Sequence, residues 1–268
     1  IDLTDLLYAL STALDIVEHE MIGVQSVHGK HVGYLSMLMA RAHGMTGTAL
    51  SDFVGTAVLH DNAFSEYVRE EFGGGSVVAE EELLRRAKLL QGQDFVDFIS
   101  GSTHSIVGEE NIRLFPFRTD VSGIILYHHE NADGTGPFHK TAAETSLSSQ
   151  IVHLADTIDV TWNLTTLTED GFDEICRTVE AQSGKLFSAE SVHLFREGVC
   201  YSDILRLQRY GAEPLMRGAI PSREEECSNE EIRRLAVLFA RIVDCKSSFT
   251  RSHSIGVAEK LDRMGHCY

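Results

Sequence analysis

The sequence predicts an all-α fold, and three observations support this. Apolar residues recur at helical spacing through most of the chain. The alternating apolar and polar runs that are typical of strands are almost absent, and proline occurs only four times in 268 residues. An apolar content of 43% and a charged content of 24% are those of a soluble globular protein.

Charge and cysteine content restrict the partners and the location. The net charge of −17 argues against DNA, RNA or an anionic membrane surface as a partner, because the protein would repel each of them. A small anionic substrate is compatible if bound cations reverse the local field. The five cysteines are odd in number and form no CxxC pair, which favours reduced thiols in a cytoplasmic protein. No apolar run approaches the ~20 residues that span a bilayer, so no membrane insertion is expected.

The first predicted helix covers residues 2–21. Its apolar residues alternate steps of four and three over nearly three heptads: Leu3, Leu7, Leu10, Leu14, Val17 and Met21. Such a seam fits a homodimer contact, and it fits equally well a helix that docks on its own domain. The segment is too short for its sequence to distinguish the two.

The next two predicted helices carry histidines. A helix over about 32–44 has His28 and His31 at its start, and the helix after it ends in the dipeptide His60-Asp61. A lone histidine on an apolar helix is more often a core residue than a ligand. An imidazole beside a carboxylate nevertheless suits manganese, iron or zinc.

More histidines follow a glycine-rich break at 72–78. His104 begins a helical stretch, and apolar spacing over 121–128 predicts another helix with His128 on its buried face. His129 would lie about 100° round that helix. From a regular helix, the two histidines would therefore serve two neighbouring ions.

A loop with two glycines and a proline leads into a long predicted helix over about 144–164. Asp156 and Asp159 lie beside its apolar stripe, and an aspartate among apolar residues is costly unless it is paired or binds a metal. Two shorter helices are predicted at about 172–182 and 188–197.

Five motifs in this order resemble those of the HD-GYP family, a branch of the HD-domain metal-dependent phosphohydrolases. The family patterns HSxRV, HD, HxxxG, HHExxDGxGYP and VAD are matched, in order, at residues 28–32, 60–61, 104–108, 128–136 and 154–156. The sequence SGKLF at 183–187 resembles the closing family motif SGxxFDP without its last two residues. The resemblance covers about residues 15–200 and implies an HD-domain helical bundle with a short glycine loop.

The resemblance also implies a chemistry: hydrolysis of cyclic di-GMP, or a related cyclic dinucleotide, to pGpG or GMP by a hydroxide that two metals activate. All seven metal ligands that it implies are present: His28, His60, Asp61, His104, His128, His129 and Asp156. Asp61 would bridge the ions, with His60 beside it in the catalytic centre. Asp133, Gly134 and Gly136 are the implied substrate-binding residues. Two divalent ions are expected, iron or manganese by resemblance, although the ligand types also permit zinc or nickel.

Five departures from the family pattern bear on phosphate and metal binding. Phe64 stands where the family has a lysine, and Thr165 and Thr168 stand where it has basic phosphate contacts. Pro137 replaces the tyrosine of GYP, and Val24 replaces an acidic ligand for a third metal, which favours two metals. Each lost charge-assisted phosphate contact is worth about 1.5–3 kcal/mol.

These departures support a second hypothesis, a degenerate and catalytically weak signalling scaffold or nucleotide sensor that retains metal. A single-metal HD phosphohydrolase fits less well, because His104, His128 and His129 would be surplus. Residues 201–228 are predicted to link a domain over 1–200 to the beginning of a second, incomplete HD-GYP-like unit over 229–268. In that unit His253 begins another match to HSxRV.

Overall fold

The computed structural model describes residues 1–22, 27–63 and 102–243, and every regular element in these ranges is helical. The helices are α1 (Leu3–Ile22), α2 (His28–Ala42), α3 (Gly47–Val58), α7 (Ser102–Ile112), α8 (Leu147–Thr161), the 3₁₀ helix η1 (Leu164–Thr166), α9 (Glu169–Ala181), α10 (Ala189–Gly198), α11 (Tyr201–Tyr210), α12 (Ala212–Ala219) and α13 (Asn229–Val243). The all-α prediction is confirmed. The predicted break at 72–78, the departures at Val24 and Phe64, and His253 lie outside the described residues.

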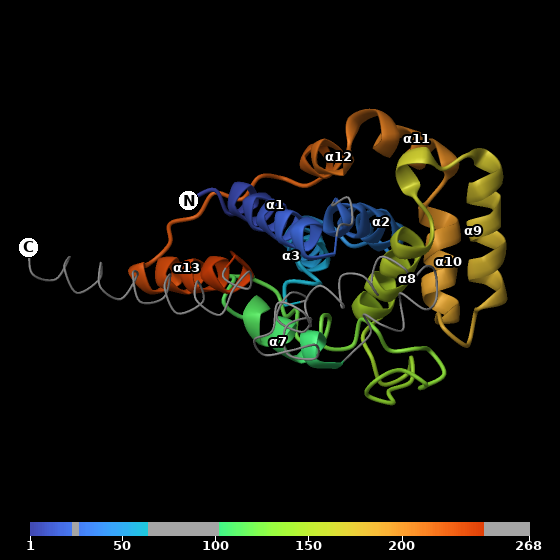
Figure 1. Cartoon of the computed structure of the whole chain (residues 1–268), viewed down its shortest axis with the longest axis horizontal. Helices are drawn as coiled ribbons and strands as arrows, with labels where there is room; N and C mark the ends of the chain where they lie inside the picture. The colour runs from blue at the N-terminus through green and yellow to red at the C-terminus, as the bar shows by residue number, and fades with distance from the viewer. Residues whose placement is uncertain (23–26, 64–101, 244–268) are drawn as a thin grey trace, which may run out of the picture.

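Helix α2 is the centre of the arrangement. It packs against α3, α8, α10 and α12, and their apolar faces form the main hydrophobic cluster. Helices α9, α10 and α11 lie at one end of the molecule, and α1 and α13 lie toward the other (Figure 1). Serine or threonine hydroxyls cap the first turns of α8, α9 and α10, which fixes where these helices begin.

Helix α1 docks on its own chain. The described part of its seam, Leu3, Leu7, Leu10 and Leu14, is buried in a second hydrophobic cluster. The apolar face of α13 supplies the opposing residues Leu235, Leu238 and Ile242. Docking within the chain, one of the two alternatives, therefore accounts for these leucines. A homodimer through this helix stays a prediction. None of the described helices is both long and apolar enough to cross a membrane.

Most of the segment predicted as a linker is helical. Helices α11 and α12 occupy residues 201–219, and Ile204, Leu207 and Met216 on them are buried in the main cluster. This part of the chain therefore shares the core of the preceding helices. The division of the chain into domains stays a prediction.

The helix predicted over 121–128 is wrong, because residues 122–129 form successive turns. Gly123 has a positive φ of 77°, which a regular helix does not contain. The buried carboxylate of Glu109 on α7 accepts hydrogen bonds from the backbone N–H groups of Gly123 (2.9 Å) and Leu126 (3.2 Å). A tertiary contact thus takes N–H groups that a helix would use. Ile124 and Ile125 are nevertheless buried, as their spacing predicted.

The crossing of α2 and α3 depends on Gly29. A Cβ atom at this position would lie 2.5 Å from the backbone oxygen of Val58. We expect Gly29→Ala to lower the free energy of unfolding by about 1–3 kcal/mol through overpacking, although alanine is the better helix former by up to ~1 kcal/mol. Urea denaturation measures this. Gly218→Ala on α12, where a Cβ meets nothing within 4 Å, is the control and should stabilise or leave stability unchanged.

Candidate metal centre

Five separate segments bring the seven predicted ligands together. His28 begins α2, the dipeptide His60-Asp61 follows α3, and His104 lies in the first turn of α7. The turns before α8 carry the histidine pair at 128–129, and Asp156 lies in the middle of α8. All of these side chains are buried except that of His28, which is 14% exposed.

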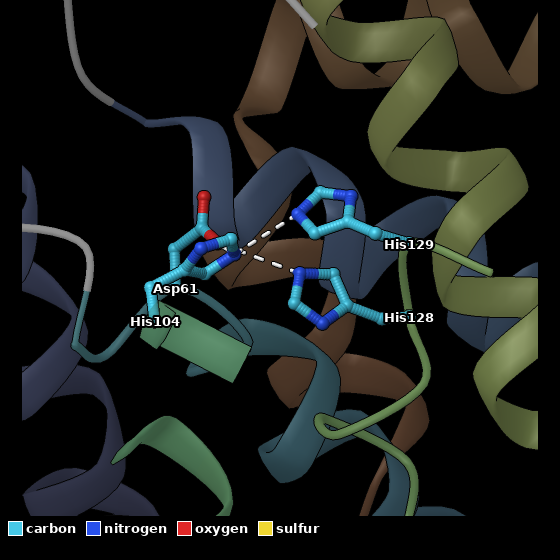
Figure 2. A group of neighbouring side chains, drawn as sticks. All are labelled: Asp61, His104, His128 and His129. Carbon is cyan, nitrogen blue, oxygen red and sulfur yellow. Dashed lines mark hydrogen bonds and ion pairs between the residues drawn. The ribbon is translucent and has the colours of Figure 1, made fainter. Parts of the chain in front are cut away.

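The seven residues form two groups, and within each group one ligand atom per residue lies within 4.8 Å of the others. The first group is Asp61, His104, His128 and His129, shown in Figure 2. The second group is His28, His60 and Asp156. The histidine pair thus faces one group rather than two, contrary to the expectation from a regular helix. The cause is the turn geometry of 122–129, which places the two rings with centroids 3.9 Å apart.

Asp61 lies between the two groups. Its Oδ1 atom faces the Nε2 atoms of His104 (3.7 Å) and His128 (3.6 Å) in the first group. Its Oδ2 atom faces the Nε2 atoms of His60 (3.4 Å) and His28 (3.8 Å) in the second group. One carboxylate therefore presents a different oxygen to each group.

Asp156 spans the groups in the same way. Its Oδ1 atom lies 3.2 Å from Nε2 of His28 and 3.7 Å from Nε2 of His60. Its Oδ2 atom faces Nδ1 of His129, at 3.8 Å, in the first group. Asp61, in the turn after α3, and Asp156, on α8, thus connect the same two clusters of imidazoles.

Backbone carbonyls select the nitrogen with which His60 and His128 face the centre. Nδ1 of His60 donates to the carbonyl of Ala57 (3.0 Å), and Nδ1 of His128 donates to the carbonyl of Ile125 (2.5 Å). Because a carbonyl only accepts, Nδ1 carries the proton and Nε2 is left to bind a cation. Both Nε2 atoms, and Oδ1 of Asp61, are buried without a hydrogen-bond partner among the described residues.

Electrostatics favour ionised aspartates in the centre. Burial raises the pKa of Asp61, but the imidazoles of His60, His128 and His104 outweigh burial and hold that pKa well below its usual range. The same balance, with His28 and His60 as the opposing groups, lowers the pKa of Asp156. Both carboxylates are therefore charged at neutral pH, as cation ligands must be.

The pKa shifts of four of these histidines differ between the two groups. Burial lowers the pKa of His104 to about 4 and that of His129 well below its usual value, so both are neutral at pH 7, as an imidazole must be to bind a cation. Burial also lowers the pKa of His28 and His60, but Asp156 and other neighbouring aspartates reverse this and raise both. A cation in the second group therefore competes with protons. These donors fit a divalent metal, and the mixed imidazole and carboxylate set suits iron, manganese or zinc.

The loop after the histidine pair is organised by Glu130. Its carboxylate accepts hydrogen bonds from the backbone N–H groups of Phe138 (2.6 Å) and Lys140 (2.5 Å), so it orders the loop. A Cβ at Gly136 would lie 2.7 Å from the Cα of Glu130, so only glycine fits there. Asp133 is exposed and accepts from both the N–H and the hydroxyl of Thr135.

The structure does not bring the three predicted substrate-binding residues into either group. Asp133, Gly134 and Gly136 form the loop beside the centre, and the loop is anchored by a hydrogen bond from the N–H of Ala132 to the carbonyl of Leu186. The residue that sequence reasoning missed is Glu109, which shapes the turns that carry the histidine pair. The sequence signal that could have identified Glu109 is its place on the same helix as His104.

His153 provides a pH-dependence test. It is 6% exposed, and burial lowers its pKa from the usual 6.5 to about 4. Between these values the unfolded chain binds more protons than the folded one, so stability falls as pH falls. From pH 7 to 4.5, the free energy of unfolding of the metal-free wild type should fall by roughly 2–3 kcal/mol more than that of His153→Gln, at 1.36 kcal/mol per pKa unit.

Urea denaturation at both pH values measures this difference. His193→Gln, at an exposed histidine, is the control, and an equal pH dependence in wild type and His153→Gln contradicts the assignment.

Comparison with known proteins places the centre in a family. A family model described as HD domain matches residues 28–161, half of the chain, and this range contains all seven ligand candidates. The chain is 23% identical over 274 residues to 3'3'-cGAMP-specific phosphodiesterase 1 of Vibrio cholerae, an alignment that covers 98% of this chain and 58% of that protein. It is 25% identical over 198 residues to a cyclic di-GMP phosphodiesterase of Thermotoga maritima, with 72% and 48% covered.

A solved structure shares the fold. The crystal structure of a cyclic GMP-AMP specific phosphodiesterase of V. cholerae matches with a TM-score of 0.68 and 21% identity, over 94% of this chain and 62% of that one. The chain spans about half the length of the curated relatives that it matches. The family model, the shared helical fold and the clustered motif residues agree, and the chain belongs to the HD domain family.

Proposed function

We propose that this chain is a divalent-metal-dependent phosphodiesterase that hydrolyses a small cyclic dinucleotide, cyclic di-GMP or a related molecule. The observation that carries the proposal is the pair of aspartates, Asp61 and Asp156, each of which presents separate oxygens to two groups of imidazoles. The two curated relatives, whose names specify 3'3'-cGAMP and cyclic di-GMP, support this substrate class.

The seven residues would hold two ions, one in each group. When bound, such ions lower the pKa of a water molecule and neutralise phosphate oxygens. Asp61 connects the groups and is the proposed catalytic carboxylate. His60 is fixed by the carbonyl of Ala57 and keeps Nε2 directed at both aspartates. Burial of nearly all of these side chains limits the access of bulk water to the reacting atoms.

The charge of the chain makes cations a condition for substrate binding. At −17, the protein repels a dinucleotide that carries two phosphates, and the centre itself contains two ionised aspartates. Bound cations reverse that field locally. We place the loop of Asp133, Gly134 and Gly136 beside the substrate, since it follows the histidine pair and is held rigid by Glu130.

Metal content is the first test. Wild-type protein purified without oxygen should contain about two ions per chain, iron or manganese by our proposal, as measured by elemental analysis. His104→Ala should reduce the content in the first group, and Asp173→Asn, at an exposed residue of α9, should leave it unchanged. A metal-free wild type that takes up no iron, manganese, zinc or nickel would contradict the site assignment.

Turnover is the second test. Metal-free protein should be inactive toward cyclic di-GMP and 3'3'-cGAMP, and addition of manganese or anaerobic iron should produce the linear dinucleotide or the mononucleotides. Chromatography of the products separates these outcomes. Chelation after loading should abolish the activity, which distinguishes it from a contaminating enzyme that retains its metal.

The second candidate is a scaffold or sensor that retains metal without hydrolysis. The specific support for this candidate is the structural role of Thr168, at a position where the family has a basic residue. Its hydroxyl accepts a hydrogen bond from the N–H of Gly171 at the start of α9 and so serves as a helix cap. Phe64 and Thr165 likewise stand at positions where the family has basic residues. Full metal occupancy with no hydrolysis of any cyclic dinucleotide would favour this candidate.

A further inference from the structure

Asp159 joins two histidines beside the metal centre. It lies on α8 three residues after Asp156, and each oxygen of its carboxylate faces one imidazole. The Nδ1 atom of His28 lies 2.7 Å from Oδ2, and the Nδ1 atom of His31 lies 2.7 Å from Oδ1. The three side chains are only 9–14% exposed. Asp159 belongs to neither candidate metal group.

The contact with Asp159 decides how His28 is presented. An ionised carboxylate only accepts hydrogen bonds, so Nδ1 of His28 carries the proton. Nε2 is then the nitrogen that faces the centre, 3.2 Å from Asp156 and 3.8 Å from Asp61. His60 obtains the same orientation from a backbone carbonyl, whereas His28 obtains it from a side chain. A carboxylate that accepts a hydrogen bond from the other ring nitrogen of a ligating histidine also makes that imidazole a more basic metal ligand.

His31 holds Asp159 in place. It follows His28 by three residues on α2, so both imidazoles lie on the same side of the helix and reach one carboxylate on α8. With one oxygen bonded to His31, the carboxylate cannot turn away from His28 without losing that bond. The arrangement also fixes α2 against α8, the helices that supply two of the three members of the second group.

We propose that Asp159 and His31 are positioning residues for the second metal, acting through His28 to fix the tautomer and ring orientation of that ligand. The inference rests on the proposed function, because it requires that the second group binds an ion. His31 stands at the arginine position of the HSxRV pattern, so this chain would use an imidazole to hold the carboxylate.

Manganese titration of metal-free full-length protein tests the inference. Counting bound ions at equilibrium, we expect Asp159→Asn to weaken one of the two sites about 10–100-fold and to leave the other unchanged. His31→Leu should weaken the same site, and His31→Gln, which restores a donor, should recover most of the affinity. Glu190→Gln is the matched control. It removes an exposed carboxylate that faces His43, and neither residue belongs to a candidate metal group.

Thermal unfolding of the metal-free variants separates positioning from general support of the fold. Positioning predicts near wild-type melting without metal together with the loss of affinity at one site. Two sites of wild-type affinity in Asp159→Asn, or equal weakening of both sites with a lower melting temperature, would overturn the inference and leave the proposed function standing. If the wild type binds no manganese, iron, zinc or nickel, both the inference and the proposed function are contradicted.

Discussion

Asp61→Asn is expected to abolish hydrolysis of the cyclic dinucleotide and to reduce metal binding in both groups. The reason is geometric, because Oδ1 of Asp61 faces His104 and His128 while Oδ2 faces His28 and His60. Asparagine has nearly the same volume but no charge and only one oxygen. On the proposed function, the loss of a carboxylate that would serve both metal groups should cost several kcal/mol of transition-state stabilisation, or at least ~10³-fold in kcat/KM.

The measurement combines turnover with elemental analysis of the same preparation. Asp173→Asn makes the same chemical change at an exposed residue of α9 and should retain full activity and metal. Circular dichroism of the metal-free variants checks that both are folded. Retention of two ions and of turnover in Asp61→Asn would show that the shared carboxylate is not what holds the centre together.

The second large effect is expected in stability, from Asp52→Ala on α3. Asp52 is 1% exposed. Its Oδ2 atom accepts from the N–H of Arg118 (2.7 Å) and from the N–H (2.7 Å) and hydroxyl (2.9 Å) of Thr119. Its Oδ1 atom pairs with the guanidinium of Arg223, at 2.7 Å. Truncation leaves three donors without their acceptor. It also removes one of the two carboxylates that pair with Arg223, which keeps Glu225 and the carbonyl of Pro116.

Leaving three part-buried donors unpaired and removing one partner of an ion pair should together cost about 3–5 kcal/mol, and the melting temperature should fall on the order of 10 °C. Urea denaturation and a thermal scan measure this, with Asp173→Ala as the exposed control. Metal content should be unchanged, since Asp52 is in neither group. In a double-mutant cycle, Asp52→Ala and Arg223→Ala should be strongly non-additive. A loss below about 1 kcal/mol, the range of a solvated pair, would contradict this account.

Local periodicity explains which parts of the fold the sequence predicted well. Helices α1, α2, α8, α9 and α10 were predicted within a few residues, because a helix that buries one face repeats its apolar residues at a spacing that sequence alone displays. The same spacing over 121–128 predicted which side chains are buried but not the backbone. There Gly123 and the Glu109 carboxylate, an acceptor from another helix, replace helical hydrogen bonds.

The sequence by itself determined the helical class of the protein and the order of the seven candidate ligands, because both depend on residue type and spacing along the chain. Only the tertiary structure decided how those ligands divide into two groups, that Asp61 and Asp156 span them, and that the carboxylate of Asp159 contacts Nδ1 of His28. It also decided that α13 packs against Leu3, Leu7, Leu10 and Leu14 of α1. Periodicity shows that a face is buried, whereas the partner that buries it is set by contacts between residues far apart in the chain.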